Sequence, residues 1–317
     1  MRPLEVSPSL LLNARLSPEF ERRLAGEFRI HPLWQEQDAV AFLARHGGEF
    51  AGVVTTAPVG ASAALIDALP NLRVIVSRGV GYDAIDLDRA RGRRISVSNT
   101  PGVLTACVAD LAFGALIAAA RGLCAADRFV RRGDWRRGRF PMTTRVNGKR
   151  LGILGLGAIG RAIARRASGF DMEVRYHNRR AVPDVPYIYE SSLPELARWA
   201  DFLVLACSGG PETRHLVSGD VLAALGTDGF LVNVARGTVV DEPALVEALI
   251  DQRIAGAALD VYEHEPNVPE ALIGLDNVVL LPHISSSSRE TLAAMEALIF
   301  ENLRSFFAEG RMVTPIA

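Results

Sequence analysis

Residues 151–180, with the sequence LGILGLGAIGRAIARRASGFDMEVRYHNRR, decide how this chain folds. The pattern predicts a short apolar strand, a glycine turn, a helix and a second strand. Gly155, Gly157 and Gly160 form the spacing G-x-G-x-x-G. In such a turn the first glycine permits a sharp bend, the second lets the backbone approach a pyrophosphate, and the third lets helix and strand pack closely. A plain strand–helix turn is the alternative, but a strand on each side favours a dinucleotide site.

The end of this stretch indicates which dinucleotide binds. An NAD site carries an Asp or Glu about 20 residues after the glycines, where it accepts a hydrogen bond from the ribose 2′-hydroxyl. Here the second strand ends at Asn178, followed by Arg179 and Arg180. Asn178 does not repel an anion, and two guanidinium groups can hold a 2′-phosphate in forked geometry. We therefore expect NADPH/NADP+ as the cofactor, with an ordinary solvated arginine pair as the alternative.

Length and composition limit the possible classes of protein. A chain of 317 residues is long enough for two domains, and its net charge of −1 offers no general attraction to nucleic acid or to an acidic membrane. The three cysteines, Cys107, Cys124 and Cys207, lie in apolar stretches without metal-ligand spacing. We therefore expect buried cysteines, a reducing compartment and no metal site.

Neither the start of the chain nor its most apolar stretch indicates a membrane. The first residues lack the apolar core of a secretion signal. The most apolar stretch, 106–120, contains Asp110 and is too short to span a bilayer. A cytoplasmic protein is therefore expected, with no membrane and no nucleic acid among its partners.

Strand and helix signals alternate through the first 100 residues and again after residue 150. Such alternation is typical of parallel sheets covered by helices, so the expected fold class is α/β with two doubly wound sheets. Six strands are expected in the second series, the number that a dinucleotide-binding sheet needs. The last helix, 289–309, is amphipathic and follows the last strand, so we expect it to pack back on the first domain.

A glycine-rich turn, SRGVGYD at 77–83, follows a predicted strand of the first series. The amides of Val80 and Gly81 could hold a carboxylate there, with Arg78 nearby. From the turn alone, a simple change of chain direction is the favoured alternative. The sequence NTPG at 99–102 breaks both helix and strand and is a candidate hinge.

Three motifs follow predicted strands of the second series. They read NVARG at 233–237, DVYEHEP at 260–266 and LPHISS at 281–286. The carboxyl ends of parallel strands meet at one edge of the sheet, where ligands bind. We therefore expect all three motifs at the nicotinamide end of the dinucleotide.

The side chains in these motifs suit hydride transfer to a keto acid. Arg236 can hold the substrate carboxylate and polarise the carbonyl, and His283 can donate the proton because imidazole exchanges protons near neutral pH. A carboxylate should orient the imidazole, and Glu265 and Glu263 are equal candidates by composition. Asp260 could bind the nicotinamide carboxamide. Taken singly, His283 could be a surface residue and Arg236 could form a loop salt bridge, but their joint placement favours a catalytic site.

The motifs GLGAIG, NVARG, DVYEHEP and LPHISSSS, with their order and spacing, resemble those of the D-isomer-specific 2-hydroxyacid dehydrogenases. Within that family the sequence is most similar to the NADPH-preferring glyoxylate/hydroxypyruvate reductases. The resemblance covers nearly the whole chain, including SRGVGYDAID, NTPGVLT and VADLAFGALI. Arg236, Glu265 and His283 are separated by 29 and then 18 positions, as in the family.

The resemblance implies a role for each motif. Arg236 would bind the substrate, and Asp260 would bind the nicotinamide. Glu265, rather than Glu263, would be the partner of His283. The amides of the glycine-rich turn at 77–83 would hold the substrate carboxylate, which makes that turn part of the predicted site.

The family fold implies a Rossmann cofactor domain inserted into a flavodoxin-like substrate domain. The cofactor domain would span 101–284, and the substrate domain would combine 1–100 with 285–317. A homodimer through the 104–121 region is also implied. In some relatives the tryptophan that matches Trp135 reaches the partner's active site.

The sequence departs from the family at two positions. Ser285 stands where the family usually has glycine, so the local backbone or pocket shape could differ. Asn178 replaces a common aspartate, which agrees with the use of NADP(H).

The predicted site comprises three sets of residues. The catalytic residues are Arg236, Glu265 and His283. The substrate-binding residues are Arg78, Val80, Gly81, Arg236 and His283. The cofactor-binding residues are Gly155, Leu156, Gly157, Ala158, Ile159, Gly160, Asn178, Arg179, Arg180, Cys207, Val234, Ala235, Asp260 and His283.

The expected reaction is the NADPH-dependent reduction of small 2-keto acids, such as glyoxylate and hydroxypyruvate, to D-2-hydroxy acids. Reduction of 2-ketogluconate or phenylpyruvate is the alternative among enzymes. A corepressor-like protein that senses NAD(P) is the alternative from another class. The presence of Arg236, Glu265 and His283 argues against that last alternative.

Overall fold

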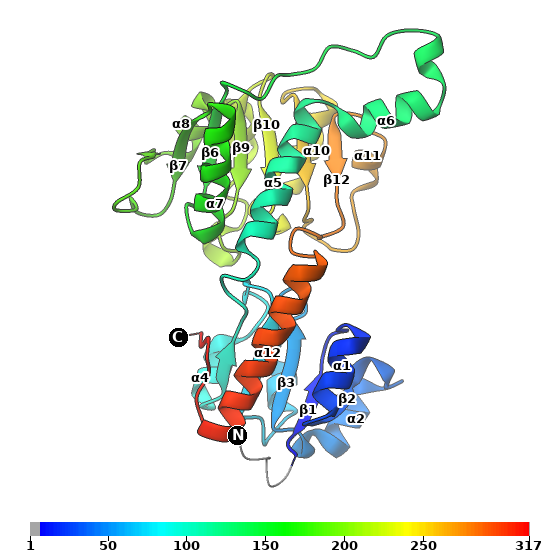
Figure 1. Ribbon diagram of the computed structural model, residues 1–317, viewed down its shortest axis with the longest axis vertical. Helices are drawn as coiled ribbons and strands as arrows, with labels where there is room; N and C mark the ends of the chain where they lie inside the picture. The colour runs from blue at the N-terminus through cyan, green and yellow to red at the C-terminus, as the bar shows by residue number, and fades with distance from the viewer. Residues whose placement is uncertain (1–6, 317) are drawn as a thin grey trace. The chain divides into compact units, whose positions relative to one another are not determined.

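The computed structural model describes residues 7–316. The chain divides into two compact units, and Figure 1 shows both. The first unit combines the residues up to Leu104 with those from Arg289 onward, and the second is Thr105–Ser288. The divisions expected from the sequence lie after residues 100 and 284, and the first six residues of the expected first domain lie outside the described residues.

The first unit contains a five-stranded parallel sheet with the order β2-β1-β3-β4-β5. Its strands are β1 (Ser9–Leu12), β2 (Arg29–Pro32), β3 (Gly52–Thr56), β4 (Val74–Arg78) and β5 (Ser96–Ser98). Its helices are α1 (Pro18–Ala25), α2 (Ala39–His46), α3 (Ala63–Asp67), α4 (Leu87–Gly92) and α12 (Arg289–Glu309). This is the flavodoxin-like strand order, as predicted. Helix α4 is short and half of its residues are charged, so no apolar period in the sequence predicts it.

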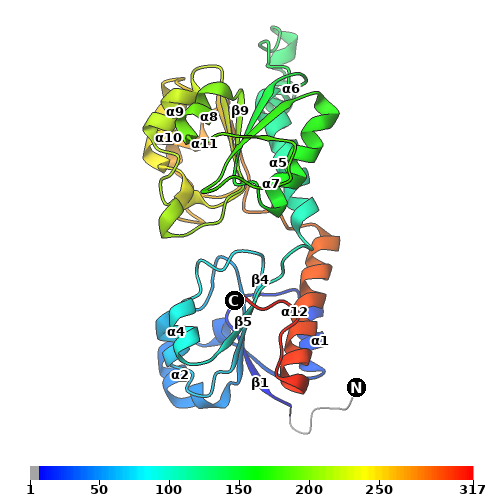
Figure 2. The same cartoon turned by 90° about the vertical axis from the view of Figure 1, so that its left-hand side faces the viewer.

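Helix α12 returns to the first unit, as its amphipathic pattern predicted. Its buried Ile299 and Leu303 pack with Leu10 and Val76 on one face of the sheet. Leu11, the neighbour of Leu10 in β1, points to the opposite face and joins a second buried cluster. Figure 2 shows the result, with α1 and α12 on one side of this sheet and α2 and α4 on the other.

The second unit contains a seven-stranded parallel sheet with the order β12-β11-β10-β9-β6-β7-β8. Its strands are β6 (Arg150–Leu154), β7 (Glu173–His177), β8 (Ile188–Tyr189), β9 (Phe202–Leu205), β10 (Phe230–Asn233), β11 (Gly256–Leu259) and β12 (Val278–Leu280). The order is that of the Rossmann dinucleotide-binding sheet with one further strand, β12, at its edge. The predicted count of six strands was wrong because β8 is too short to show an alternating pattern.

Helices cover both faces of this second sheet. They are α5 (Thr105–Ala120), α6 (Leu123–Arg131), α7 (Ala158–Ala167), α8 (Leu193–Trp199), α9 (Gly219–Leu225), α10 (Glu242–Ile250) and α11 (Glu270–Ile273). Figure 2 shows α5 and α7 on one side and α8, α9 and α10 on the other. Because both faces of the sheet are covered, β9 and β11 are apolar throughout, whereas β7, nearer the edge, alternates between buried residues and exposed or partly exposed ones.

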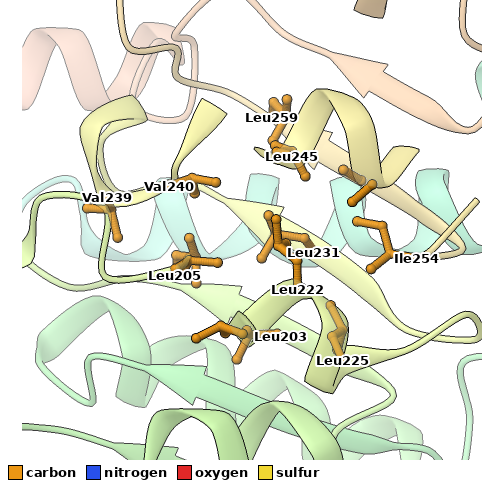
Figure 3. Close-up of a cluster of buried hydrophobic side chains, with 14 of the residues drawn as sticks. Leu203, Leu205, Leu222, Leu225, Leu231, Val239, Val240, Leu245, Ile254 and Leu259 are labelled. Carbon is orange, nitrogen blue, oxygen red and sulfur yellow. The ribbon is translucent and has the colours of Figure 1, made fainter. Parts of the chain in front are cut away.

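The core under α8, α9 and α10 consists mainly of branched aliphatic side chains. Leu203 and Leu205 of β9 meet Leu231 of β10, and Leu222 and Leu245 cover them from α9 and α10 (Figure 3). Each fully buried leucine contributes roughly 1.5–3 kcal/mol by leaving water. This packing fixes the strand ends that carry the motifs.

The apolar helix α5 belongs to the core of the second unit. Its buried side chains include Val108, Ala112 and Leu116, and the helix contacts β10, β11 and α7. Within residues 7–316, no single helix is long and apolar enough to cross a membrane. By length and composition alone, α5 and α6 pass that test as a pair, but a bend of 58° separates them.

One local expectation was wrong. Cys124 is exposed, because it lies on the outer part of α6, while Cys107 and Cys207 are partly buried. The cap of α8 is not a reciprocal capping box. The Ser192 hydroxyl accepts the amide of Glu195, but the Ser192 amide donates to Glu190, because the Glu195 carboxylate pairs with Arg198 one turn later.

We expect Leu203→Ala to lower the free energy of unfolding of the second unit by about 2–5 kcal/mol, because it leaves a cavity in a core that cannot fully collapse. Ile250→Ala, on the exposed side of α10, should change it by less than about 1 kcal/mol. Urea unfolding of both variants measures the difference. Equal effects would contradict the assignment of Leu203 to the core.

Candidate active site

The glycine turn after β6 is shaped by two steric constraints. Gly155 has φ +99°, and a Cβ there would lie 2.5 Å from the amide nitrogen of Cys207. A Cβ on Gly160 would lie 2.1 Å from the carbonyl oxygen of Gly155. Both positions therefore exclude a larger residue. A Cβ on Gly157 would meet nothing within 4 Å, so the space above this residue is open to a ligand.

Helix α7 begins directly after the turn, and its first amides are available to that ligand. Gly157 is the N-cap and provides no side-chain cap. The first amides of a helix have no partner within the helix, and they carry the positive end of its dipole. An open space over uncapped helical amides fits a pyrophosphate, so the turn can hold a dinucleotide.

Asn178 supports this turn from the end of β7. Its Oδ1 accepts the Leu156 amide at 2.7 Å, and its own carbonyl accepts the Tyr189 hydroxyl at 3.2 Å. An aspartate could accept the same amide, so asparagine keeps the support and removes the negative charge. Arg179 and Arg180 follow and are exposed.

Arg179 has a partner that the sequence analysis missed. Its Nη1 lies 2.6 Å from Oε2 of Glu212, in the short helix η5 (Pro211–Thr213) after β9, and both side chains are mostly exposed. Glu212 therefore pairs with Arg179, one of the two arginines predicted to bind a 2′-phosphate. No pattern in the sequence relates two positions that lie in different loops.

The histidine of the last motif forms the closest pair in the site. His283 follows β12, and its Nδ1 lies 2.7 Å from Oε2 of Glu265. The other oxygen of Glu265 accepts the Tyr262 amide at 3.1 Å. Because Nδ1 is engaged, Nε2 is the ring nitrogen that remains for a substrate.

Glu263 has a different role, which settles the choice between the two glutamates. Its buried carboxylate lies 2.6 Å from Arg214 and 3.1 Å from His215. Its backbone amide donates to Glu242 at 3.0 Å. Glu263 thus joins the loop after β9 to the loop after β11, and Glu265 alone pairs with His283.

Asp260 holds the backbone around His283. Its two carboxylate oxygens accept the amides of Ile284 at 2.7 Å and Ser285 at 2.8 Å, and its carbonyl accepts the amide of His283 at 2.9 Å. His283 has φ +54°, a left-handed conformation that costs a non-glycine residue about 1–3 kcal/mol. Ser285 does not share this conformation, so serine fits here without strain in place of the family glycine.

Arg236 reaches the same edge because Gly237 permits a close backbone contact. A Cβ on Gly237 would lie 1.9 Å from the carbonyl carbon of Tyr262. The turn after β10 therefore touches the turn that carries Glu265. Asn233 keeps this turn in place by accepting the Ala235 amide and donating to the Arg236 carbonyl.

The first unit contains the second predicted carboxylate site, the turn after β4. Gly79 has φ +117°, and a Cβ there would lie 2.8 Å from the Cβ of Ala57. The amides of Val80 and Gly81 donate to no acceptor in the part of the chain that the structure describes. Two neighbouring amides that point outward form a small anion-binding concavity.

Arg78 lies beside this turn but also faces an acid. Its Nη1 is 3.7 Å from Oε1 of Glu296 on α12. Burial lowers the pKa of Arg78 from its usual value, and the charge of Glu296 opposes that shift. Glu296 itself accepts the Ser17 hydroxyl at 3.0 Å, so it remains anchored within the first unit.

The pKa of Glu265 is lowered from its ordinary value of 4.5. Burial alone would raise this pKa, but the hydrogen bond with His283, its charge and the Tyr262 amide outweigh burial, and the charge of Arg236 adds to the effect. Two other groups of the second unit shift in the opposite direction because burial dominates. The pKa of Tyr262 rises to about 12 and that of Cys207 to about 11, so both stay protonated at neutral pH.

A lowered carboxylate pKa stabilises the folded state above the ordinary value, and this contribution is lost as the pH falls through the folded value. We therefore expect Glu265→Gln to be less stable than the wild type at about pH 7, with a difference that shrinks below about pH 4.5. Urea midpoints across this range measure it, with exposed Glu270→Gln as the control for loss of a charge. A difference that stays constant with pH would contradict the pairing.

Comparisons with known proteins agree with this arrangement. Residues 113–285 match the sequence model of the D-isomer specific 2-hydroxyacid dehydrogenase NAD binding domain. Glyoxylate/hydroxypyruvate reductase A of Arabidopsis thaliana is 44% identical over 98% of this chain and 99% of its own. The 2-ketogluconate reductase of Gluconobacter oxydans is 43% identical over 98% of both chains.

A solved structure is similar over the same length. The NADPH-dependent glyoxylate/hydroxypyruvate reductase of Sinorhizobium meliloti, in complex with NADP and malonate, has a TM-score of 0.93 and 40% identity over 98% of this chain and 97% of its own. Both domains are therefore those of this group of proteins. The chain belongs to the D-isomer-specific 2-hydroxyacid dehydrogenase family.

Proposed function

We propose that the protein reduces small 2-keto acids, such as glyoxylate and hydroxypyruvate, to D-2-hydroxy acids with NADPH. The observation that carries this proposal is the 2.7 Å contact between His283 Nδ1 and Glu265 Oε2. It lies at the same sheet edge as the open glycine turn after β6 and as Arg236. A proton donor, a cation and a dinucleotide site on one edge suit hydride transfer to a carbonyl.

His283 is the proposed proton donor. When bound, the nicotinamide supplies the hydride to the carbonyl carbon. The carbonyl oxygen then needs a proton, which His283 can deliver from Nε2 because Glu265 holds Nδ1 and stabilises the charged imidazole. The reduced substrate carries one hydride on carbon and one proton on oxygen, so charges balance once His283 is reprotonated from water.

Arg236 and the first-unit turn are the proposed anchors of the keto acid. The guanidinium of Arg236 would hold the carboxylate and the carbonyl oxygen, where negative charge develops. The amides of Val80 and Gly81 would bind the carboxylate as neutral donors. Arg78 is a weaker candidate for direct binding because Glu296 already offsets part of its charge.

The residues after β7 support NADPH as the cofactor. Gly155, Gly157 and Gly160 would cradle the pyrophosphate, and the neutral Asn178 leaves no carboxylate to repel a 2′-phosphate. Arg180 has no acidic partner within residues 7–316, while Arg179 is shared with Glu212. The Sinorhizobium meliloti relative is described as NADPH-dependent, which points the same way.

We also propose a cytoplasmic homodimer. Support for the assembly comes from exposed apolar side chains after α5, among them Leu123, Val130 and Trp135. An isolated chain would leave these side chains in water, and a second copy could cover them. Free thiols at all three cysteines agree with a reducing compartment.

An absorbance assay of NADPH oxidation tests the activity. We expect turnover with glyoxylate and hydroxypyruvate, and His283→Ala should lower kcat by about 10²–10⁴-fold without weakening NADPH binding. A preference for 2-ketogluconate or phenylpyruvate would select the alternative substrates. NADPH binding without oxidation by any of the four acids would instead indicate a nucleotide-sensing protein.

The cofactor assignment has its own test. Arg179→Ala combined with Arg180→Ala should lower the NADPH:NADH ratio of kcat/KM by about tenfold or more, because charge-assisted hydrogen bonds to the 2′-phosphate are lost. Glu212→Gln should raise affinity for NADPH by roughly two- to fivefold, since it frees Arg179 from an exposed pair. Neither change should alter the KM for NADH. An unchanged ratio in the double variant would exclude this role.

A further inference from the structure

In the glycine-rich turn at 77–83, the amides of Val80 and Gly81 are oriented by hydrogen bonds to the carbonyls on the opposite side of the same peptides. The carbonyl of Gly79 and the amide of Val80 belong to one trans peptide, so they point in opposite directions. The Gly79 carbonyl accepts the amide of Thr100 at 3.0 Å and its hydroxyl at 3.2 Å. Asn99 acts in the same way on the next peptide, because its Nδ2 donates to the Val80 carbonyl at 2.7 Å and so directs the Gly81 amide outward.

Asn99 and Thr100 are themselves held by a segment far away in sequence. The Thr314 hydroxyl donates to the Asn99 carbonyl at 2.7 Å. That carbonyl shares a peptide with the Thr100 amide, which donates to Gly79. A continuous series of donors therefore runs from the Thr314 hydroxyl through two peptides to the outward amide of Val80.

The direction of this series is set by Asn302 on α12. Its Nδ2 donates to Thr314 Oγ1 at 3.0 Å, so the hydroxyl proton is left to donate to Asn99. Its Oδ1 accepts the amides of Val313 and Thr314, each at 3.0 Å. With a further bond to the Leu298 carbonyl, all the hydrogen-bonding groups of this side chain are used.

The segment that carries Thr314 is attached to the edge of the first sheet. Pro315 forms an antiparallel bridge with Ser98, and the Ile316 amide donates to Val97 at 2.8 Å. Asn302 and Thr100 are fully buried. Hydrogen bonds in series polarise one another, and burial strengthens each of them.

We propose that Asn302 and Thr314 are positioning residues for the 2-keto acid, acting through Asn99 and Thr100 on the amides of Val80 and Gly81. This inference rests on the proposed function, because it assigns those amides to the substrate carboxylate. The series ends on a donor with no acceptor of its own within residues 7–316, and a carboxylate completes it. Neither residue touches the substrate.

Thr314→Val tests the proposal, with Thr314→Ser as the matched control. Valine keeps the shape of the side chain but loses both hydrogen bonds of the hydroxyl. We expect the KM for glyoxylate or hydroxypyruvate to rise roughly fivefold. This value corresponds to losing one hydrogen bond, here the bond between the substrate carboxylate and the Val80 amide. The kcat and the fluorescence-measured Kd for NADPH should stay within about twofold, because that dissociation constant reports on the second unit. Serine should restore the wild-type KM.

A second measurement needs no turnover. Hydrogen exchange of the peptide that contains Thr100, followed by mass spectrometry, should be roughly fivefold faster at this amide in Thr314→Val than in the wild type or in Thr314→Ser. An unchanged exchange rate, an unchanged KM, or a KM raised equally by serine would overturn the inference. If the wild-type protein reduced no keto acid, the proposed function alone would be refuted. The exchange rate of the Thr100 amide would still decide whether Thr314 orders the turn.

Discussion

The buried carboxylate of Asp260 is the interaction on which the catalytic edge depends. A carboxyl group removed from water is costly unless hydrogen bonds satisfy it, and here two backbone amides do so. The same two bonds hold the turn after β12 in a shape that places His283 in a left-handed conformation. These hydrogen bonds therefore offset both the cost of burying Asp260 and the strain at His283, and they hold the turn so that the imidazole faces Glu265.

Glu263 and Glu265, separated by one residue, have different roles at this edge of the sheet. Glu263 uses its charge to join two loops through Arg214 and His215, while Glu265 faces His283. The chain turns between these two residues, with an isolated bridge between His264 and Asn267, so the two acids reach different partners. The close contact of Gly237 with Tyr262 then brings the charge of Arg236 to the correct member of the pair.

In the first unit, the turn at 77–83 is held in place by hydrogen bonds in series rather than by charged groups. The amides of Val80 and Gly81 have no side chain that could orient them. Peptide planarity lets Asn99 and Thr100 control them through the carbonyls on the opposite side. This arrangement ties a short loop to α12 and to the residues that follow it, in addition to the apolar packing that holds α12 on the first sheet.

The sequence by itself determined the α/β class, the Rossmann turn, the return of α12 and the three motifs at one sheet edge, because these depend on periodicity, glycine spacing and the common polarity of parallel strands. It also determined that position 178 lacks an acid. The motif spacing shared with the family already favoured Glu265 over Glu263 as the partner of His283. Only the tertiary structure decided that Asp260 binds the His283 turn, that Glu212 pairs with Arg179, and that Cys124 is exposed. The strand β8 and the link from Thr314 to Asn99 also appear only in the fold. Each of these joins positions with no local pattern in common, and such contacts exist only once packing has placed the loops side by side.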